Sequence, residues 1–278
     1  MRILTIDTHP QFGKSLYATN GIVELIIPLS YGIRIGHFSL CGEQNVFFEQ
    51  PADMTDLTTP QGWRHWGGHR FWVAPETEES YYPDNASISY AVEDESILLM
   101  QQEDPWLHVK KSIRILLGAD ASVQVVHRLE NTGTEARTCS LWAITALAGG
   151  GTEHIPVRRN DSVYQPMYHI SLWNDTDPSD PRVVYTPEEI RLTHTPDPRE
   201  FKMGIHHPSG PVWYENNGVT FQKAFSIDPN TVYADNNVSF ETFLCAHMVE
   251  LESLSPLMTI PVGQTREHTE VWRLHRTV

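Results

Sequence analysis

The chain has 278 residues, of which 40% are hydrophobic, and its 8 Trp, 10 Tyr and 10 Phe supply enough apolar area for a packed core. It carries 35 acidic against 20 basic residues, a net charge of -15. This charge repels phosphate backbones and anionic lipid surfaces, which argues against nucleic-acid and membrane partners and leaves neutral ligands unaffected. No run approaches 18 apolar residues, so no membrane span is expected.

The cysteines and the first ten residues favour a reducing compartment. Cys41, Cys139 and Cys245 are odd in number and far apart, which fits neither a disulfide framework nor a zinc knuckle. The opening MRILTIDTHP is too short and too polar for a secretion signal. We therefore expect a cytoplasmic protein.

Short strands are predicted along the whole chain, because the 19 Pro and 17 Gly divide it into pieces of strand-and-turn length. The N-terminal candidates are GIVELIIPL, YGIRIGHFSL and NVFFEQ. Residues 110–147 predict three consecutive strands with turns at residues 118–120 and 131–133. GVTFQKAFSI, NNVSFETFLCAHMVELESL and HTEVWRLHRTV supply at least four more. The best helix candidate is TPEEIRLTH, residues 186–194.

A dozen or more short strands with long loops indicate an all-β sandwich of mostly antiparallel strands, with under about a fifth of the residues in helix. Residues 1–278 are predicted to form one domain. Two long loop regions, residues 50–85 and 149–187, are candidates for a functional role, because long loops in compact β-proteins often carry function. We expect them to roof a cleft, with Trp173 or His206 reaching in.

The segment GGHRFWVAPE, residues 67–76, places Arg70, Trp72 and Glu76 directly after two glycines. An aromatic ring stacks on the apolar face of a sugar, and Arg and Glu bind its hydroxyls, so a ligand-binding role is one interpretation. The alternative is structural: Trp72 fills the core and Arg70 pairs with Glu76 as a clamp.

Two carboxylates in HMVELESL are predicted to lie together. On a strand, Glu250 and Glu252 point to one face and Val249 and Leu251 to the other. Neighbouring like charges raise at least one pKa, which suits a general base or acid. The alternative is a charged strand edge that serves solubility.

The 14 histidines show no HExxH or other metal spacing, so neither a metal nor a cofactor is predicted. His127 alternates with apolar neighbours and favours a hydrogen-bonded core histidine, whereas the loop residue His206 is a candidate ligand contact. The chain contains no GxSxG, Walker A, GxGxxG or CxxC motif, which argues against α/β serine hydrolases, P-loop enzymes and Rossmann oxidoreductases.

The C-terminal stretch HMVELESLSPLMTIPVGQTREHTEVWRLH resembles the ending of galactose mutarotases (aldose 1-epimerases) and their uncharacterised relatives. With GGHRFWVAPE, YYPDN and YADNNVSFETF, which contains Asp235, the similarity spans residues 21–274 in order. It implies a galactose-mutarotase-like β-super-sandwich that holds a sugar. It also implies a mechanism in which Glu252, matching the family's base, removes the anomeric proton while a histidine protonates the ring oxygen.

The family's acid histidine has no direct counterpart, because Ala148 stands where it is expected. Gly67-Gly68-His69 is a rearranged match to the family's His-Gly-Gly element, which makes His69 the first candidate for the acid, with His127 and His154 as others. Arg70, Trp72, Glu76, Glu250, Asp235 and His206 are the candidate substrate contacts.

Three functional classes remain open: an isomerase acting at or near the anomeric centre, a non-catalytic sugar-binding protein that has lost the acid, and an interaction domain. Glu252 and the charged GGHRFWVAPE segment favour the enzyme, with a small-molecule carbohydrate as partner. The sequence names neither the sugar nor the oligomeric state.

Overall fold

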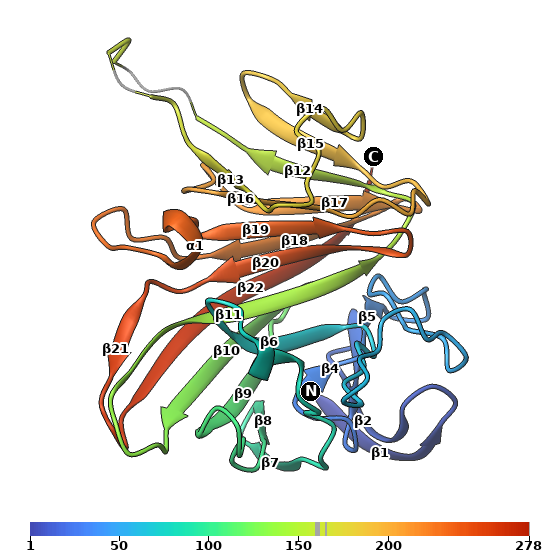
Figure 1. Cartoon of the computed structure of the whole chain (residues 1–278). Helices are drawn as coiled ribbons and strands as arrows, with labels where there is room; N and C mark the ends of the chain where they lie inside the picture. The colour runs from blue at the N-terminus through green and yellow to red at the C-terminus, as the bar shows by residue number, and fades with distance from the viewer. Residues whose placement is uncertain (159–161, 165, 278) are drawn as a thin grey trace.

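The computed structural model describes residues 1–158, 162–164 and 166–277 and consists of three antiparallel sheets (Figure 1). The smallest contains the N-terminal strands in the order β1-β2-β3-β5. Its strands are β1 (Arg2–His9), β2 (Gly13–Thr19), β3 (Val23–Pro28) and β5 (His37–Leu40).

A ten-stranded sheet has the order β14-β15-β12-β17-β18-β22-β10-β9-β8-β7. In that order its strands are Val183–Tyr185, Glu189–Thr193, Thr152–Pro156, Val212–Asn216, Val219–Phe225, Thr265–Arg276, Ser122–Asn131, Val109–Leu117, Ser96–Met100 and Ser89–Glu93.

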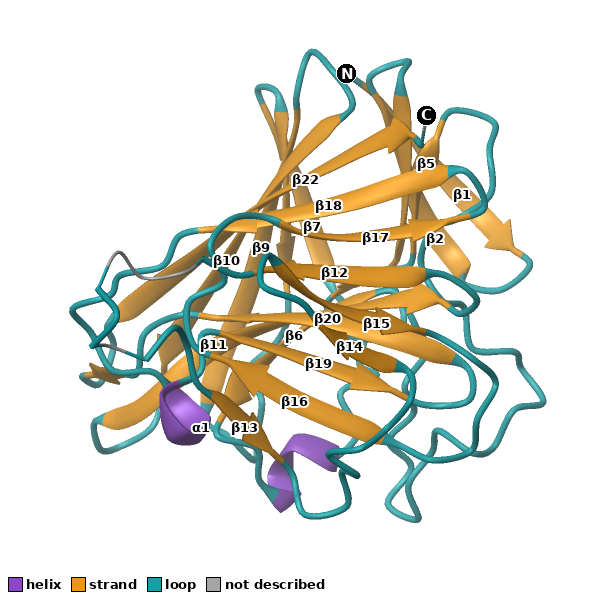
Figure 2. Cartoon of the chain, turned by 90° about the horizontal axis from the view of Figure 1, so that it is seen from above, coloured by secondary structure: helices purple, strands orange, loops and turns teal. Residues whose placement is uncertain are grey.

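An eight-stranded sheet has the order β13-β16-β19-β20-β11-β6-β4, with β21 paired to β11. In that order its strands are Ile170–Leu172, Phe201–Ile205, Phe240–Leu244, Met248–Leu254, Arg137–Ala148, His69–Ala74, Arg34–Ile35 and, for β21, Met258–Ile260. Among the described residues, helix is limited to η1 (Glu78–Tyr81) and α1 (Ala234–Asn237) (Figure 2). The predicted all-β, antiparallel class is confirmed.

The two large sheets bury their facing side chains in one apolar core. Ile113, Val125 and Trp272 enter it from the ten-stranded sheet, and Phe71 and Leu251 from the eight-stranded sheet. These residues alternate along their strands with side chains on the other face, as a half-buried strand requires. The side chains on the other face of the eight-stranded sheet therefore point away from this core.

The three strands predicted over residues 110–147 are confirmed as β9, β10 and β11, with both turns where they were expected. The helix predicted over residues 186–194 is wrong, because Glu189–Thr193 forms β15 with Ile190 and Leu192 buried at period two. NVFFEQ is not a strand either, and contributes only isolated bridges at Phe47 and Glu49.

A buried ion pair of the ten-stranded sheet is hydrogen-bonded to the facing eight-stranded sheet. Nζ of Lys223 lies 2.8 Å from Oε1 of Glu270, and both side chains are fully buried. Nζ also donates to two backbone carbonyls of the facing sheet, at 2.9 and 2.7 Å. The Ser253 hydroxyl, on that same sheet, donates to Glu270. Buried charges persist when they are paired and hydrogen-bonded in this way.

A chain of neutral histidines lies beside this ion pair. Nδ1 of His127 donates to the carbonyl oxygen of His268 at 3.0 Å, which leaves its Nε2 to accept from Nε2 of His69 at 2.7 Å. Nδ1 of His69 then accepts from the Thr145 hydroxyl at 2.9 Å. Burial lowers the pKa of His127 to about 3 and holds that of His69 well below the usual value, so both rings are uncharged at neutral pH. His127 is the core histidine that its strand pattern predicted.

Cys41, Cys139 and Cys245 are unpaired. Within the described ranges, no helix has the length and apolar composition needed to cross a membrane.

Candidate functional site

Strand register lines up charged residues across the eight-stranded sheet. Ile144 of β11 pairs with Arg70 of β6 on one side and with Glu252 of β20 on the other, and Glu252 pairs with Glu241 of β19. The neighbours of these residues along each strand point into the core, so this row lies on the opposite face. We call it the cavity face. Glu250 belongs to it as well, two residues from Glu252 on β20.

A cavity of about 440 Å³ opens over the cavity face. Its wall includes residues of both long loops, among them Trp63, His65 and Trp173, as well as side chains of the sheet. The other lining residues are Asp56, Leu57, Thr58, Thr59, Arg70, Glu76, Tyr81, Trp142, Asn174, Asp175, Thr176, Glu200, Lys202, Phe243, Met248 and Glu250.

The two glycines before β6 let the loop reach this position. Gly67 has φ of 83°, and a Cβ on it would lie 2.0 Å from the carbonyl oxygen of Phe48. Gly68 has φ of 71°, and a Cβ on it would lie 2.2 Å from the carbonyl oxygen of Ile35. The close approach that these two glycines allow is therefore made to the protein's own backbone.

Arg70 and Glu250 form an ion pair in the cavity wall. Nη1 of Arg70 lies 2.6 Å from Oε1 of Glu250, and Nε2 of His65 lies 2.8 Å from the same oxygen. Burial acts to raise the pKa of Glu250, but Arg70 and His65 outweigh it and hold that pKa below its usual value. Trp72 stacks on the guanidinium of Arg70 at 4.6 Å. Glu250 is thus a permanently ionised anchor.

Glu252 has a different environment. Burial raises its pKa to about 7, and the cation nearest to it is Lys202 of β16, whose Nζ lies 3.7 Å from Oε2. The same Nζ lies 3.1 Å from Oε2 of Glu241, whose pKa burial also raises. A carboxyl group with a pKa near neutrality can both accept and release a proton under working conditions.

Aromatic rings enclose Lys202 at the bottom of the cavity. Its ammonium lies 4.5 Å from the ring centre of Trp142 and 4.8 Å from that of Trp173. Burial acts to lower the pKa of Lys202, but Glu252 and Glu241 raise it further, so the amine stays protonated. Tyr81, in the same wall, donates its hydroxyl to Glu76. Such walls bind the apolar faces of ring-shaped ligands.

Unsatisfied buried polar atoms gather at this site. Among the described residues, 13 buried side-chain N or O atoms have no hydrogen-bond partner, and seven of them belong to five residues of the cavity and its floor. Three are donors, on Trp63, Arg70 and Trp142. The other four are the carboxyl oxygens of Glu241 and Glu252, whose charged neighbours are Lys202 and, beside Glu241, Asp235. Buried polar groups are normally satisfied, so this cluster indicates a place where a ligand supplies both donors and acceptors.

The predicted site residues divide into three groups. Arg70, Glu76 and Glu250 line the cavity. Trp72 and Glu252 lie on the same sheet face just beneath it, Trp72 against Arg70 and Glu252 against Lys202. Asp235, in the turn of α1, lies outside the lining and interacts with Glu241, and burial raises its pKa. The alternative clamp between Arg70 and Glu76 does not form, because Arg70 pairs with Glu250.

His69 and His206 are not brought into the cavity. His69 is fully buried on the core side of β6, because strand alternation sends it to the face opposite Arg70. His206 lines a separate hollow with Tyr168 and Pro208, and its ring is stacked between His169 and His207. The assignment of His69 as the acid is therefore corrected, since it has no path to Glu252.

The sequence analysis did not single out Lys202, Trp142, His65, Trp63 or Glu241. Trp142 lies in a mostly apolar strand that is buried on both faces, so no pattern indicated which face it occupies. Lys202 and His65 stand alone in loops or short strands. Only the position of Glu241 opposite the HMVELESL strand held a signal, because consecutive strands usually pair.

One group of described side chains has metal-ligand spacing: His69, His127 and Glu270, with ligand atoms within 4.8 Å of one another. These atoms already serve the histidine chain, and the ammonium of Lys223 lies against Glu270. The residues do not fit a cation, and no metal centre is proposed.

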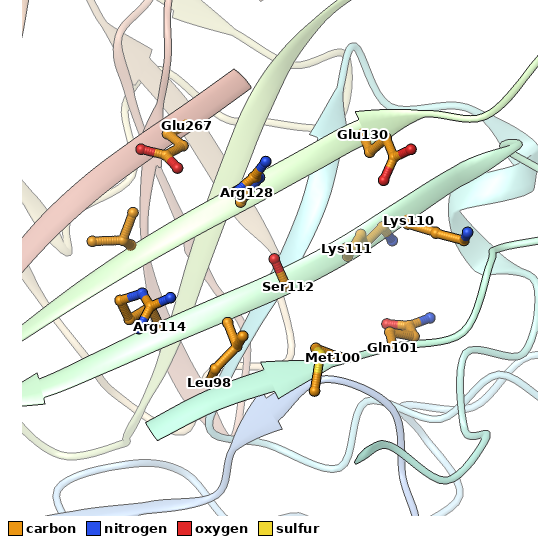
Figure 3. A pocket seen from close by; sticks show the side chains of 11 residues that line it. Leu98, Met100, Gln101, Lys110, Lys111, Ser112, Arg114, Arg128, Glu130 and Glu267 are labelled. Atoms are coloured by element: carbon orange, nitrogen blue, oxygen red, sulfur yellow. The ribbon is translucent and has the colours of Figure 1, made fainter. Parts of the chain in front are cut away.

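A second hollow, of about 360 Å³, lies on the outer face of β8, β9, β10 and β22 (Figure 3). Each of its four basic side chains has an acidic neighbour. Lys110 lies opposite Glu130 and Arg128 opposite Glu267 in the strand register. Lys111 pairs with Asp104, and Arg114 with Glu93. Its lining contains no aromatic residue. It has the character of a solvated sheet face, so the cavity over the eight-stranded sheet is the candidate site.

Several solved structures with a similar fold carry names that refer to galactose mutarotase or aldose 1-epimerase. A galactose mutarotase-like protein from Lactobacillus casei matches 94% of this chain and 100% of its own, with a TM-score of 0.62 and 8% identity. A protein from Escherichia coli K12 provisionally named an aldose 1-epimerase matches 99% and 100%, with a TM-score of 0.60 and 10% identity. A galactose mutarotase related enzyme from Lactobacillus acidophilus matches 95% and 98%, with a TM-score of 0.57 and 8% identity.

No protein-family model and no curated protein sequence matches the chain. The structural likeness establishes the galactose-mutarotase-like fold, as the sequence resemblance predicted.

We predict that Arg70→Met destabilises the protein by about 3–5 kcal/mol at pH 7, because it leaves Glu250 buried without its cation. The pKa of Glu250 is lowered in the folded state, so its stabilising contribution exists above the usual carboxylate pKa and is lost as the pH falls. The cost of the substitution should therefore shrink at pH 4, where Glu250 in the variant takes a proton. Urea unfolding at both pH values measures this.

Arg114→Met is the matched control, since Arg114 pairs with Glu93 at the surface, where both side chains are more than a third exposed. It should cost about 1 kcal/mol or less. Equal losses for the two variants, or a loss at Arg70 that does not depend on pH, would contradict the assigned ion pair.

Proposed function

We propose that the cavity binds a sugar and that the protein acts at its anomeric centre as an aldose 1-epimerase-like isomerase with Glu252 as general base. The observation that carries this proposal is the cluster of unsatisfied donors and acceptors around the cavity, within reach of a carboxyl group whose pKa is near 7. Sugar hydroxyls both donate and accept hydrogen bonds, so a pyranose can bond to the unsatisfied donors and the unsatisfied acceptors alike.

The fold supports the same proposal. The structures that share it include one named a galactose mutarotase-like protein and one provisionally named an aldose 1-epimerase. Tryptophan walls fit the apolar faces of a pyranose, and Arg70 and Glu76 offer hydroxyl partners. In the proposed reaction Glu252 removes the proton of the anomeric hydroxyl, the bond between C1 and the ring oxygen breaks, and the free aldehyde recloses on its other face.

The charge of the cavity indicates the class of sugar. Five carboxylates line it (Asp56, Glu76, Asp175, Glu200 and Glu250) against two cations. Both cations are already paired, Arg70 with Glu250 and Lys202 with Glu241 and Glu252. A phosphate or a carboxylate on the sugar meets no free cation here, so the proposed substrate is a neutral aldose.

We predict that neutral aldoses bind at least tenfold more tightly than their 6-phosphates or the matching uronates, because close like charges repel in a partly desolvated site. Isothermal titration with glucose, galactose, glucose 6-phosphate and glucuronate at low and high salt measures this. The discrimination should weaken as salt screens the carboxylates. Tighter binding of the phosphate esters would contradict the assignment.

We predict that Glu252→Gln lowers the rate of anomer interconversion by about 10²–10⁴ and leaves folding and sugar affinity nearly intact. The amide keeps the shape of the carboxyl group but cannot take the proton. Exchange NMR of the two anomers measures the rate.

Glu153→Gln is the matched control. Glu153 of β12 is also a buried carboxyl group whose pKa is raised by burial, to about 8, but it accepts from Thr242 on the core side of the sheet. Its variant should keep the wild-type rate. Full activity in Glu252→Gln would contradict the base assignment. Sugar binding by a wild-type protein without turnover would favour the non-catalytic alternative.

A further inference from the structure

Glu241 and Glu252 form a buried pair of carboxyl groups on adjacent strands. They stand directly opposite each other in the register of β19 and β20, and each is 1% exposed. Opposed side chains on neighbouring strands have Cβ atoms about 4.5–5.5 Å apart. Within the described part of the chain, the side chains that interact with their carboxyl oxygens are Lys202, which contacts both groups, and Asp235, which interacts with Glu241.

One cation serves both carboxyl groups. Lys202 offsets a single negative charge, and a second buried carboxylate beside the first would be uncompensated. Burial raises the pKa of Glu241 and of Glu252, as expected for a pair that keeps one proton. At neutral pH the three groups therefore hold one proton between the carboxyls and have no net charge.

The pair is adjacent to the cavity. Lys202 lines the cavity and contacts both carboxyl groups, and its flexible four-carbon stem allows the ammonium to shift when a ligand enters. A reactant atom beside Lys202 would thus be close to a carboxylate and a carboxylic acid at once.

We propose that Glu241 is the general acid of this site and exchanges one proton with the ring oxygen while Glu252 exchanges one with the anomeric oxygen. This inference rests on the proposed function and completes it, because His69 lies on the other face of β6.

The proton balance closes without another group. In ring opening, Glu252 takes the proton from the O1 hydroxyl, the C1–O1 double bond forms, the C1–O5 bond breaks, and O5 takes the proton of Glu241. Rotation about C1–C2 then presents the other face of the aldehyde. In reclosure Glu241 recovers its proton from O5 as the C1–O5 bond forms, and Glu252 returns a proton to O1. The pair holds one proton before and after each turnover.

Other groups in the cavity suit the acid role less well. His65 lacks a proton to give at neutral pH, since burial and then Arg70 lower its pKa to about 4. Tyr81 and Lys202 have raised pKa values and release their protons reluctantly. Lys202 instead stabilises the negative charge that moves between the two carboxyl groups.

The test compares wild type, Glu241→Gln, Glu252→Gln and Glu153→Gln in anomer exchange NMR and in sugar binding. We expect Glu241→Gln to lose about 10²–10⁴ in rate with affinity within a few-fold of wild type, because the amide mimics the protonated acid in shape. Glu153→Gln should stay within about twofold of wild type. Loss in Glu252→Gln with full activity in Glu241→Gln would overturn this inference and leave the proposed function standing. Absence of wild-type turnover on every aldose would overturn both.

The pH dependence of kcat/KM distinguishes a catalytic role of Glu241 from a structural one. The singly protonated pair is the active form, so wild-type kcat/KM should fall on both sides of neutrality. With Glu241→Gln the alkaline fall should disappear, because only Glu252 remains to titrate. The groups facing Glu241 are Lys202 from β16, Glu252 from β20 and Asp235 from α1. Retention of both limbs in Glu241→Gln would overturn the assignment.

Infrared spectroscopy tests the shared proton without turnover. At pH 7 wild type should show the carbonyl band of a buried protonated carboxyl group that persists in Glu153→Gln and is reduced in Glu241→Gln. A spectrum in which Glu153→Gln removes the whole band would overturn the inference.

Discussion

The compensation of buried charge on the cavity face is the constraint on which the site depends. Glu241, Glu250 and Glu252 lie there with two cations, Arg70 and Lys202. Because isolated buried charges are very unfavourable, each carboxyl group must share a cation or keep a proton. Arg70 is committed to Glu250, which leaves one ammonium for two carboxyl groups. The uneven division gives two neighbouring glutamates of β20 opposite behaviour, one ionised and one near its midpoint at neutral pH.

Strand alternation keeps this unbalanced charge apart from the charges that stabilise the fold. Successive residues of β20 point alternately to the core and to the cavity, so Ser253 joins the network of Glu270 while its neighbour Glu252 faces Lys202. The network between the sheets is fully hydrogen-bonded, with Lys223 and Glu270 paired and the histidines neutral. Seven of the 13 unsatisfied buried atoms of the described residues belong to the cavity and its floor. The network around Lys223 and Glu270 is thus satisfied by the protein itself, whereas the polar groups of the cavity are open to a ligand.

Period-two patterning and turn residues were sufficient to predict the all-β, antiparallel class, because they act locally, whereas the galactose-mutarotase-like fold was implied by the resemblance of the C-terminal stretch. The strands over residues 110–147 and the shared face of Glu250 and Glu252 follow from alternation and glycine or asparagine turns. Residues 186–194 misled because a Thr-Pro start and two glutamates suit a helix, whereas tertiary pairing with β12 and β14 makes the segment a strand.

Only some residues of the site could be predicted, because the side chains that interact there come from strands far apart in the sequence. Arg70 pairs with Glu250 across 180 positions, and Lys202 reaches Glu252 from β16. His69 was chosen for its place in a motif, but the face of a residue depends on which neighbour enters the core, and Phe71 decided that. Register between strands, which composition does not reveal, brought Glu241 opposite Glu252.

A crystal structure of the wild-type protein with a neutral aldose is the most direct measurement of the central claim, that the cavity over the eight-stranded sheet holds a sugar at Glu252. The account predicts a pyranose against Trp142 and Trp173, with its anomeric oxygen within hydrogen-bond reach of Glu252, about 2.6–3.2 Å. A sugar bound in the hollow over β8, β9, β10 and β22, with the cavity empty at saturating concentration, would contradict it.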